Sequence, residues 1–164
     1  MNTPIKVLIV DDSILVRESA RKLLSAQANI QVMDTASDAI LAWEKMQRAW
    51  PDVIVLDIQM PRMDGISFLR KIMAERPTPV VICSSLIANG AQAGIDALAA
   101  GAVGLISKPK TDVLSFFSDE SDNIVAAVRA AARSHPERLR AAARAVAPPR
   151  APVESTERLP AAKQ

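Results

Sequence analysis

The sequence predicts an α/β fold in which a doubly wound, five-stranded parallel sheet carries helices on both faces. Two observations predict it. Short runs rich in β-branched residues alternate five times with longer segments of helical periodicity, and four of these runs end in a polar or charged group. Repeated strand–helix units favour a parallel sheet covered on both faces, with right-handed crossovers. We expect the flavodoxin-like strand order 2-1-3-4-5.

The first half of the chain supplies two strand–helix units. Run 5–10 predicts the first strand, and segment 14–26 predicts the first helix because its apolar residues return at helical spacing. Run 30–36 and segment 38–48 repeat this arrangement, and Asp38 or the serine before it can cap the second helix. The apolar faces of these two helices are marked by Leu15, Ala20, Leu23, Leu24, Ile40, Leu41, Trp43 and Met46.

The second half continues the pattern. Run 53–57 predicts the third strand, and segment 65–75 predicts the third helix, with Asp64 as its N-terminal cap. Runs 79–83 and 103–107 predict the fourth and fifth strands, with a fourth helix between them. The apolar face of the third helix is marked by Ile66, Phe68, Leu69, Ile72 and Met73.

The C-terminal part of the chain is less regular. Segment 109–123 is longer than the usual connection of about 2–6 residues, and the Ala-rich, amphipathic stretch Ile124–Arg133 predicts the fifth helix. Residues 134–164 hold six Arg or Lys and three Glu, a net charge of +3, and several prolines. We therefore interpret 1–133 as one domain and 134–164 as an interdomain linker, partly helical and then disordered.

Composition limits the classes of function. The formal net charge of +2 does not indicate a nucleic-acid binder. The excess of positive charge lies in the C-terminal segment 134–164. Cys83, the single cysteine, lies in an apolar run where a core role is expected, and it fits a reducing cytoplasm. No signal peptide and no apolar run of ~20 residues is visible. We expect a cytoplasmic protein without nucleic-acid binding or membrane insertion.

Charged and polar residues stand at the ends of four predicted strands. Asp11 and Asp12 follow the first, Asp57 ends the third, Ser84 follows the fourth and Lys108 follows the fifth. These groups should meet at the carboxyl edge of the sheet, where open α/β sheets bind ligands. Adjacent carboxylates suit Mg²⁺, a carboxylate can attack a phosphoryl group, and an ammonium can pair with either. Each residue also has a structural explanation, as a cap or a surface charge, but their convergence favours phosphate-and-metal chemistry with Asp57 as nucleophile.

This set of residues resembles the phosphoacceptor site of response-regulator receiver domains. The segment from Asp57 to Gly65, Asp-Ile-Gln-Met-Pro-Arg-Met-Asp-Gly, is similar to the stretch that follows the acceptor in that family. Segments 77–86 and 97–103, together with Lys108-Pro109, resemble more narrowly the receivers of the chemotaxis protein-glutamate methylesterases (CheB). The receiver resemblance covers roughly residues 5 to 133.

The resemblance implies a ligand set for Mg²⁺, the expected cofactor. Asp12 and Asp57 would bind the metal directly, Asp11 mainly through water, and the backbone carbonyl of Gln59 would complete the protein's share. Lys108 would pair with Asp57 before the reaction and with a phosphoryl oxygen after it.

The resemblance also implies a switch. Ser84 would hydrogen-bond the phosphoryl group and move toward it. An aromatic residue usually lies three positions before the lysine, but this chain has Leu105 there and contains no tyrosine. Repacking of Leu105 is therefore expected in place of an aromatic rotation.

As a receiver of this kind, the chain would accept a phosphoryl group on Asp57 from a chemotaxis histidine kinase. In a full protein, phosphorylation would relieve inhibition of an attached methylesterase domain, which is absent from this chain, and chemoreceptors would be indirect partners. The fourth helix, fifth strand and fifth helix would form the partner face, with 109–123 close to it. The chain alone would catalyse only its own phosphorylation and dephosphorylation.

Three other functions compete with this interpretation. A single-domain regulator that binds a partner after phosphorylation would normally end near the fifth helix, whereas this chain adds about 30 residues. A phosphatase with an aspartate nucleophile usually has an acid two positions later, where Gln59 cannot transfer protons. A DNA-binding regulator would need a helix-turn-helix, which does not follow the linker.

Overall fold

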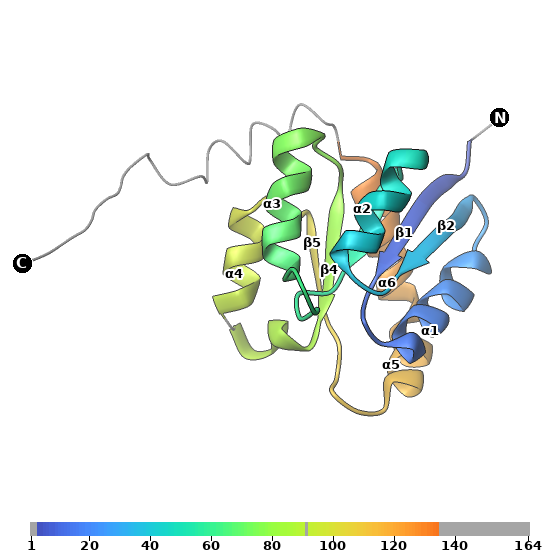
Figure 1. Ribbon diagram of the computed structural model, residues 1–164. Helices are drawn as coiled ribbons and strands as arrows, with labels where there is room; N and C mark the ends of the chain where they lie inside the picture. Colours follow the sequence, from blue (N-terminus) through green and yellow to red (C-terminus); the bar gives the residue numbers. More distant parts are fainter. Residues whose placement is uncertain (1–2, 91, 135–164) are drawn as a thin grey trace, which may run out of the picture.

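The computed structural model describes residues 3–90 and 92–134, which form a parallel sheet between two layers of helices (Figure 1). The sheet has the order β2-β1-β3-β4-β5, and all four pairings are parallel. The predicted fold class and strand order are therefore confirmed, and the predicted strand ranges agree within one residue at each end. The strands are β1 (Ile5–Val10), β2 (Ile30–Ala36), β3 (Val53–Leu56), β4 (Val80–Ser84) and β5 (Gly104–Ser107).

The helices lie on both faces because successive strand residues point in opposite directions. Leu8 and Val10 of β1 belong to the core shared with α2, α3 and α4, whereas Val7 and Ile9 belong to the core shared with α1, α5 and α6. Within residues 3–90 and 92–134, no helix is long and apolar enough to cross a membrane. The helices are α1 (Ile14–Ser25), α2 (Ala39–Arg48), α3 (Gly65–Glu75), the 3-10 helix η1 (Ser85–Gly90), α4 (Gln92–Ala99), α5 (Val113–Asp119) and α6 (Ser121–Ala132).

Side-chain caps fix the loops that leave the carboxyl edge of the sheet. Ser13 accepts a hydrogen bond from a backbone N–H of the first turn of α1, at 3.3 Å. Asp38 and Asp64 do the same for α2 and α3, at 2.9 Å each. The predicted caps of the second and third helices are confirmed. The loops held by Ser13 and Asp64 are those that carry Asp12 and Asp57.

The prediction for segment 109–123 was wrong, because most of it is helical. Helix α5 occupies Val113–Asp119, a break at Glu120 follows, and the last helix begins at Ser121 rather than Ile124. Phe117 of α5 is buried in the core on the α1 side of the sheet, with the ring of Phe116 edge-on to it at 5.3 Å. Burial of an aromatic face, rather than local propensity, stabilises so short a helix. The predicted linker lies outside the described residues, except for Ser134.

Candidate functional site

The polar ends of the strands meet at the carboxyl edge of the sheet, as the sequence predicted. Backbone hydrogen bonds bring them together: the N–H of Asp57 donates to Val10 at 2.9 Å, and the N–H of Lys108 donates to Ser84 at 3.2 Å. One carboxylate oxygen from each of the three aspartates lies within 4.8 Å of the other two. This acidic cluster consists of Asp11, Asp12 and Asp57.

Lys108 lies between two of these carboxylates. Its Nζ hydrogen-bonds Asp11 Oδ2 and lies 3.6 Å from Asp57 Oδ2. All three side chains are nearly enclosed, with exposed fractions of 9%, 3% and 6% for Lys108, Asp11 and Asp57. The expected pairing with Asp57 is present, but Asp11 is the nearer partner. One ammonium cannot balance three carboxylates, so the cluster retains negative charge that a divalent cation would neutralise.

Burial and the neighbouring charges shift the pKa values of these three side chains. Burial raises the pKa of Asp57, and the neighbouring Asp11 charge raises it further, while Lys108 and the Ser84 hydroxyl act to lower it. Burial also raises the pKa of Asp11, against the opposing charge of Lys108. Burial works to lower the pKa of Lys108, but the charges of Asp11 and Asp57 raise it overall. The lysine therefore stays protonated, and the carboxylates are held in a charge state that their surroundings disfavour.

An open hollow of about 610 Å³ leads from solvent to this edge, and Asp12, Gln59 and Asp64 are among its lining residues. Asp12 is exposed, whereas Asp11 and Asp57 are buried. An oxygen-rich site with two buried carboxylates, one exposed carboxylate and a nearby backbone loop fits a hard cation such as Mg²⁺. The donor set therefore fits the metal that the sequence analysis predicted.

The two predicted switch residues occupy different surroundings. Ser84 is fully buried, and its hydroxyl accepts a hydrogen bond from the Leu86 N–H at 3.2 Å, at the start of η1. Leu105 pairs with Ile82 in the sheet and packs against the core on the α2–α3–α4 face. A Cβ at Gly94 of α4 would lie 3.4 Å from Leu105 Cδ1, so this side chain sits directly under α4.

Two arginines that the sequence analysis missed support the loops around the site. Arg17 of α1 donates to the Asp11 carbonyl at 2.8 Å. Arg62, which has a positive φ of 72°, forms an ion pair with the buried carboxylate of Asp38. Each contact joins residues whose spacing follows no helix or strand periodicity, so no sequence pattern pointed to them. Cys83 is buried and its pKa is raised to about 12 by burial, as expected for a core residue rather than a reactive thiol.

The fold and site define the class of protein. Residues 7–115 match the family described as the response regulator receiver domain, and the chain belongs to that family.

The individual relatives are named as protein-glutamate methylesterases/protein-glutamine glutaminases. The chain is 60% identical over 133 residues to protein-glutamate methylesterase/protein-glutamine glutaminase 2 of Dechloromonas aromatica, a match covering 81% of this chain and 37% of the relative. It is 55% identical over 141 residues to protein-glutamate methylesterase/protein-glutamine glutaminase 1 of Xanthomonas oryzae pv. oryzae, a match covering 86% of this chain and 40% of the relative. The chain thus spans about two-fifths of the length of these relatives.

Solved structures agree in fold. The response regulator domain of Thermotoga maritima CheB superposes with a TM-score of 0.76 at 37% identity, covering 81% of this chain and 99% of that domain. A chain in the crystal structure of the CheX-CheY-BeF3-Mg²⁺ complex from Borrelia burgdorferi matches with a TM-score of 0.65 at 30% identity. The match covers 78% of this chain and 89% of the Borrelia chain.

Replacing Asp57 with asparagine is expected to stabilise the metal-free protein. The surroundings raise the pKa of Asp57, which means that they disfavour its charge, and an amide of the same shape removes that charge. We expect a gain on the order of 1 kcal/mol in the free energy of unfolding, measured by urea denaturation in EDTA. Millimolar Mg²⁺ should then stabilise the wild type more than Asp57→Asn. A loss of stability in EDTA would contradict this account of the site.

Proposed function

We propose that this chain is the regulatory receiver of a chemotaxis protein-glutamate methylesterase/glutaminase and that Asp57 is its phosphoacceptor. The observation that carries the proposal is the buried Asp57 carboxylate, which lies beside Lys108 and within 4.8 Å of two further carboxylates at the carboxyl edge of the sheet. The relatives named above are methylesterases over a longer chain, and the whole activity is inferred from them.

The chemistry follows from the positions of the side chains. A carboxylate oxygen of Asp57 attacks the phosphorus of a phosphohistidine, an acyl phosphate bond forms, and the phosphorus–nitrogen bond breaks as the imidazole leaves. Asp12, Asp57, the Gln59 carbonyl and, through water, Asp11 would hold Mg²⁺, which offsets the negative charge of the phosphoryl group. Lys108 pairs with a phosphoryl oxygen once the bond has formed.

The output of the site is a shift between two receiver conformations. Ser84 lies at the end of β4 and Leu105 lies under α4, so a movement of the serine toward a phosphoryl group would reach the helix through packed neighbours. Ile95, Leu98 and Val103, on α4 and just before β5, are exposed apolar residues. We assign to this face, with α6, the contact that holds a methylesterase domain inactive until phosphorylation.

Segment 109–123, which the resemblance places close to the partner face, holds helix α5. Phe117 of α5 packs in the core next to α1, on the other side of the sheet from α4. Helix α6 contacts β5, whereas α5 contacts α1, so we place the output contact on α4, β5 and α6 and not on α5. A chemotaxis histidine kinase is the proposed phosphodonor, chemoreceptors are indirect partners, and the proposed compartment is the cytoplasm.

Intact-mass spectrometry tests the acceptor. After incubation with acetyl phosphate and Mg²⁺, the wild type should gain the mass of one phosphoryl group, and Asp57→Asn should gain none. Asp52→Asn is a matched control, because Asp52 is exposed at the opposite edge of the sheet, where it accepts a hydrogen bond from the Lys6 N–H. Adduct formation should fail in EDTA. An adduct that persists in Asp57→Asn would assign the chemistry to another residue and overturn the proposal.

A further inference from the structure

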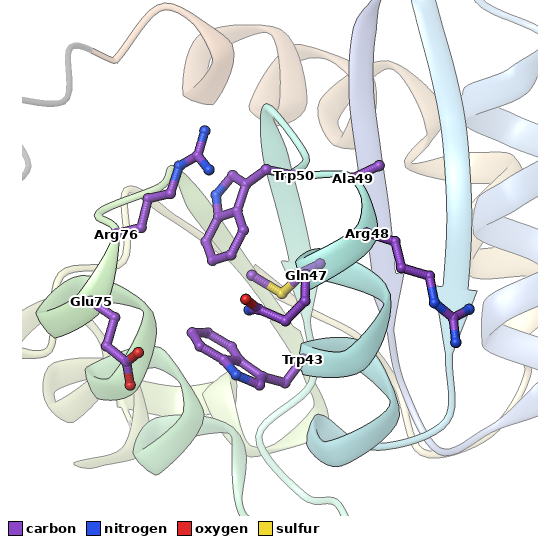
Figure 2. A pocket seen from close by; sticks show the side chains of 8 residues that line it. Trp43, Gln47, Arg48, Ala49, Trp50, Glu75 and Arg76 are labelled. Atoms are coloured by element: carbon purple, nitrogen blue, oxygen red, sulfur yellow. The ribbon is translucent and has the colours of Figure 1, made fainter.

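Two adjoining hollows lie at the amino edge of the sheet, opposite the acidic cluster. The first, of about 350 Å³, lies between the C-terminal ends of α2 and α3, and its lining includes Trp43, Trp50 and Arg76 (Figure 2). The second, of about 490 Å³, shares Trp50 and Arg76 with the first and continues along the loops that precede β1, β3 and β4. We call these two hollows together the tryptophan groove.

The aromatic rings of the groove are held in place. Trp50 donates from Nε1 to Thr78 Oγ1 at 2.7 Å, and its ring lies edge-on to that of Trp43 at 5.7 Å. Lys71 lies 4.5 Å from the Trp43 ring centre and Arg76 lies 4.7 Å from the Trp50 ring centre. Both tryptophans are nevertheless only partly buried. Rings that are already fixed bind a ligand with little ordering cost.

The chemistry of the groove favours a nearly uncharged occupant. The charged side chains that line the groove sum to zero, because the positive charges of Arg48 and Arg76 are offset by the negative charges of Asp52 and Glu75. Four prolines, including Pro77 and Pro79, add apolar, rigid surface along the second hollow that also contains Trp50. Grooves lined by aromatic rings are the surfaces that recognise proline-rich segments, above all those with two prolines three positions apart.

The chain carries such a segment a short distance beyond the groove. The described fold ends at Ser134, which itself lines the second hollow together with Ala132. Residues 148–153 read Pro-Pro-Arg-Ala-Pro-Val, in which Pro149 and Pro152 have the required spacing and Arg150 is the one charged residue. Thirteen residues, 135–147, separate Ser134 from Pro148, enough to span up to ~45 Å, so the segment can return to the groove.

We propose that residues 148–153 of this chain bind the tryptophan groove. The contact is intramolecular, so a short tether presents the segment at a millimolar effective concentration, and even a weak intrinsic affinity gives substantial occupancy. The bound segment would hold the chain that follows the receiver against the edge of the sheet remote from Asp57. This inference does not depend on the proposed phosphorylation.

Tryptophan fluorescence tests the proposal, because the two tryptophans of the chain both line the groove and the chain has no tyrosine. In the full chain, the triple change Pro148→Ser, Pro149→Ser, Pro152→Ser should raise the acrylamide quenching constant about twofold, as expected for a groove occupied at least half of the time. The double change Pro136→Ser, Pro160→Ser is the matched control and should leave quenching unchanged.

Three outcomes would overturn the proposal: equal quenching in the triple variant and the wild type, an equal rise in the control, or protection in the wild type that is lost on dilution. The last result would assign the groove to a second copy of the chain. A peptide of residues 146–155 added to the triple variant should restore protection. Phosphorylation of Asp57 is measured separately, by intact mass. A negative quenching result would therefore not contradict Asp57 as the acceptor, and a missing phosphoryl adduct would not contradict binding of 148–153 to the groove.

Discussion

Replacing Lys108 with methionine will destabilise the metal-free protein by about 3 kcal/mol, the scale expected when one partner of a buried ion pair is removed. Methionine keeps the length and apolar stem of the side chain but leaves Asp11 and Asp57 without their shared ammonium. Both carboxyl groups are already held above their ordinary pKa by burial, and Lys108 is the charge that opposes this shift. Equilibrium denaturation in EDTA measures the loss.

The pH dependence of this variant has a definite sign. Without Lys108 the pKa values of Asp11 and Asp57 rise further above those in the unfolded chain, so the folded state binds more protons. Stability must then increase as pH falls, and the deficit of Lys108→Met should be smaller near pH ~5 than near pH ~8. Lys110→Met is the matched control, because Lys110 is exposed, and it should change stability little. A deficit independent of pH would mean that lost packing, not unpaired charge, destabilises the variant.

The acidic cluster could be predicted from the sequence because the topology of parallel strands fixes its position. Once 5–10 and 53–57 are strands, Asp11 and Asp57 must lie at one edge, whatever the packing of the helices. The nearer pairing of Lys108 with Asp11 could not be predicted in this way, since it depends on the path of one side chain across neighbouring strand ends.

Helix α5 shows the opposite case. Its sequence is rich in serine and aspartate, which lowers its intrinsic helix propensity. Burial of Phe117 against α1 compensates, and that contact is between segments about 100 residues apart in the chain. A local pattern carries no signal for such a contact. Arg62 could not be predicted for the same reason, because its positive φ is held by an ion pair with Asp38, which lies on another loop.

Gly65→Ala will damage both the fold and the acceptor. A Cβ at this position would lie 2.2 Å from the Asp57 carbonyl oxygen and 2.7 Å from the Ile58 Cα, and both are backbone atoms that cannot rotate away. The hydrogen bond from the Gly65 N–H to the Ile58 carbonyl, at 2.8 Å, holds the chain in this close approach. We expect a loss of about 3 kcal/mol in the free energy of unfolding, at the upper end for overpacking.

The effect on chemistry separates this glycine from an ordinary packing residue. To relieve the overlap, the loop that carries Asp57 must shift by roughly 1 Å, which can lower a positioned reaction by up to about a hundredfold. The acetyl phosphate reaction should therefore be at least tenfold slower under conditions where the variant is folded. Gly94→Ala provides the same substitution in α4, where the new Cβ would meet only side-chain atoms at 3.4 Å or more. Equal rates for the two folded variants would show that the approach of Gly65 to Asp57 serves stability alone, whereas slowing confined to Gly65→Ala would show that this glycine sets the position of the acceptor.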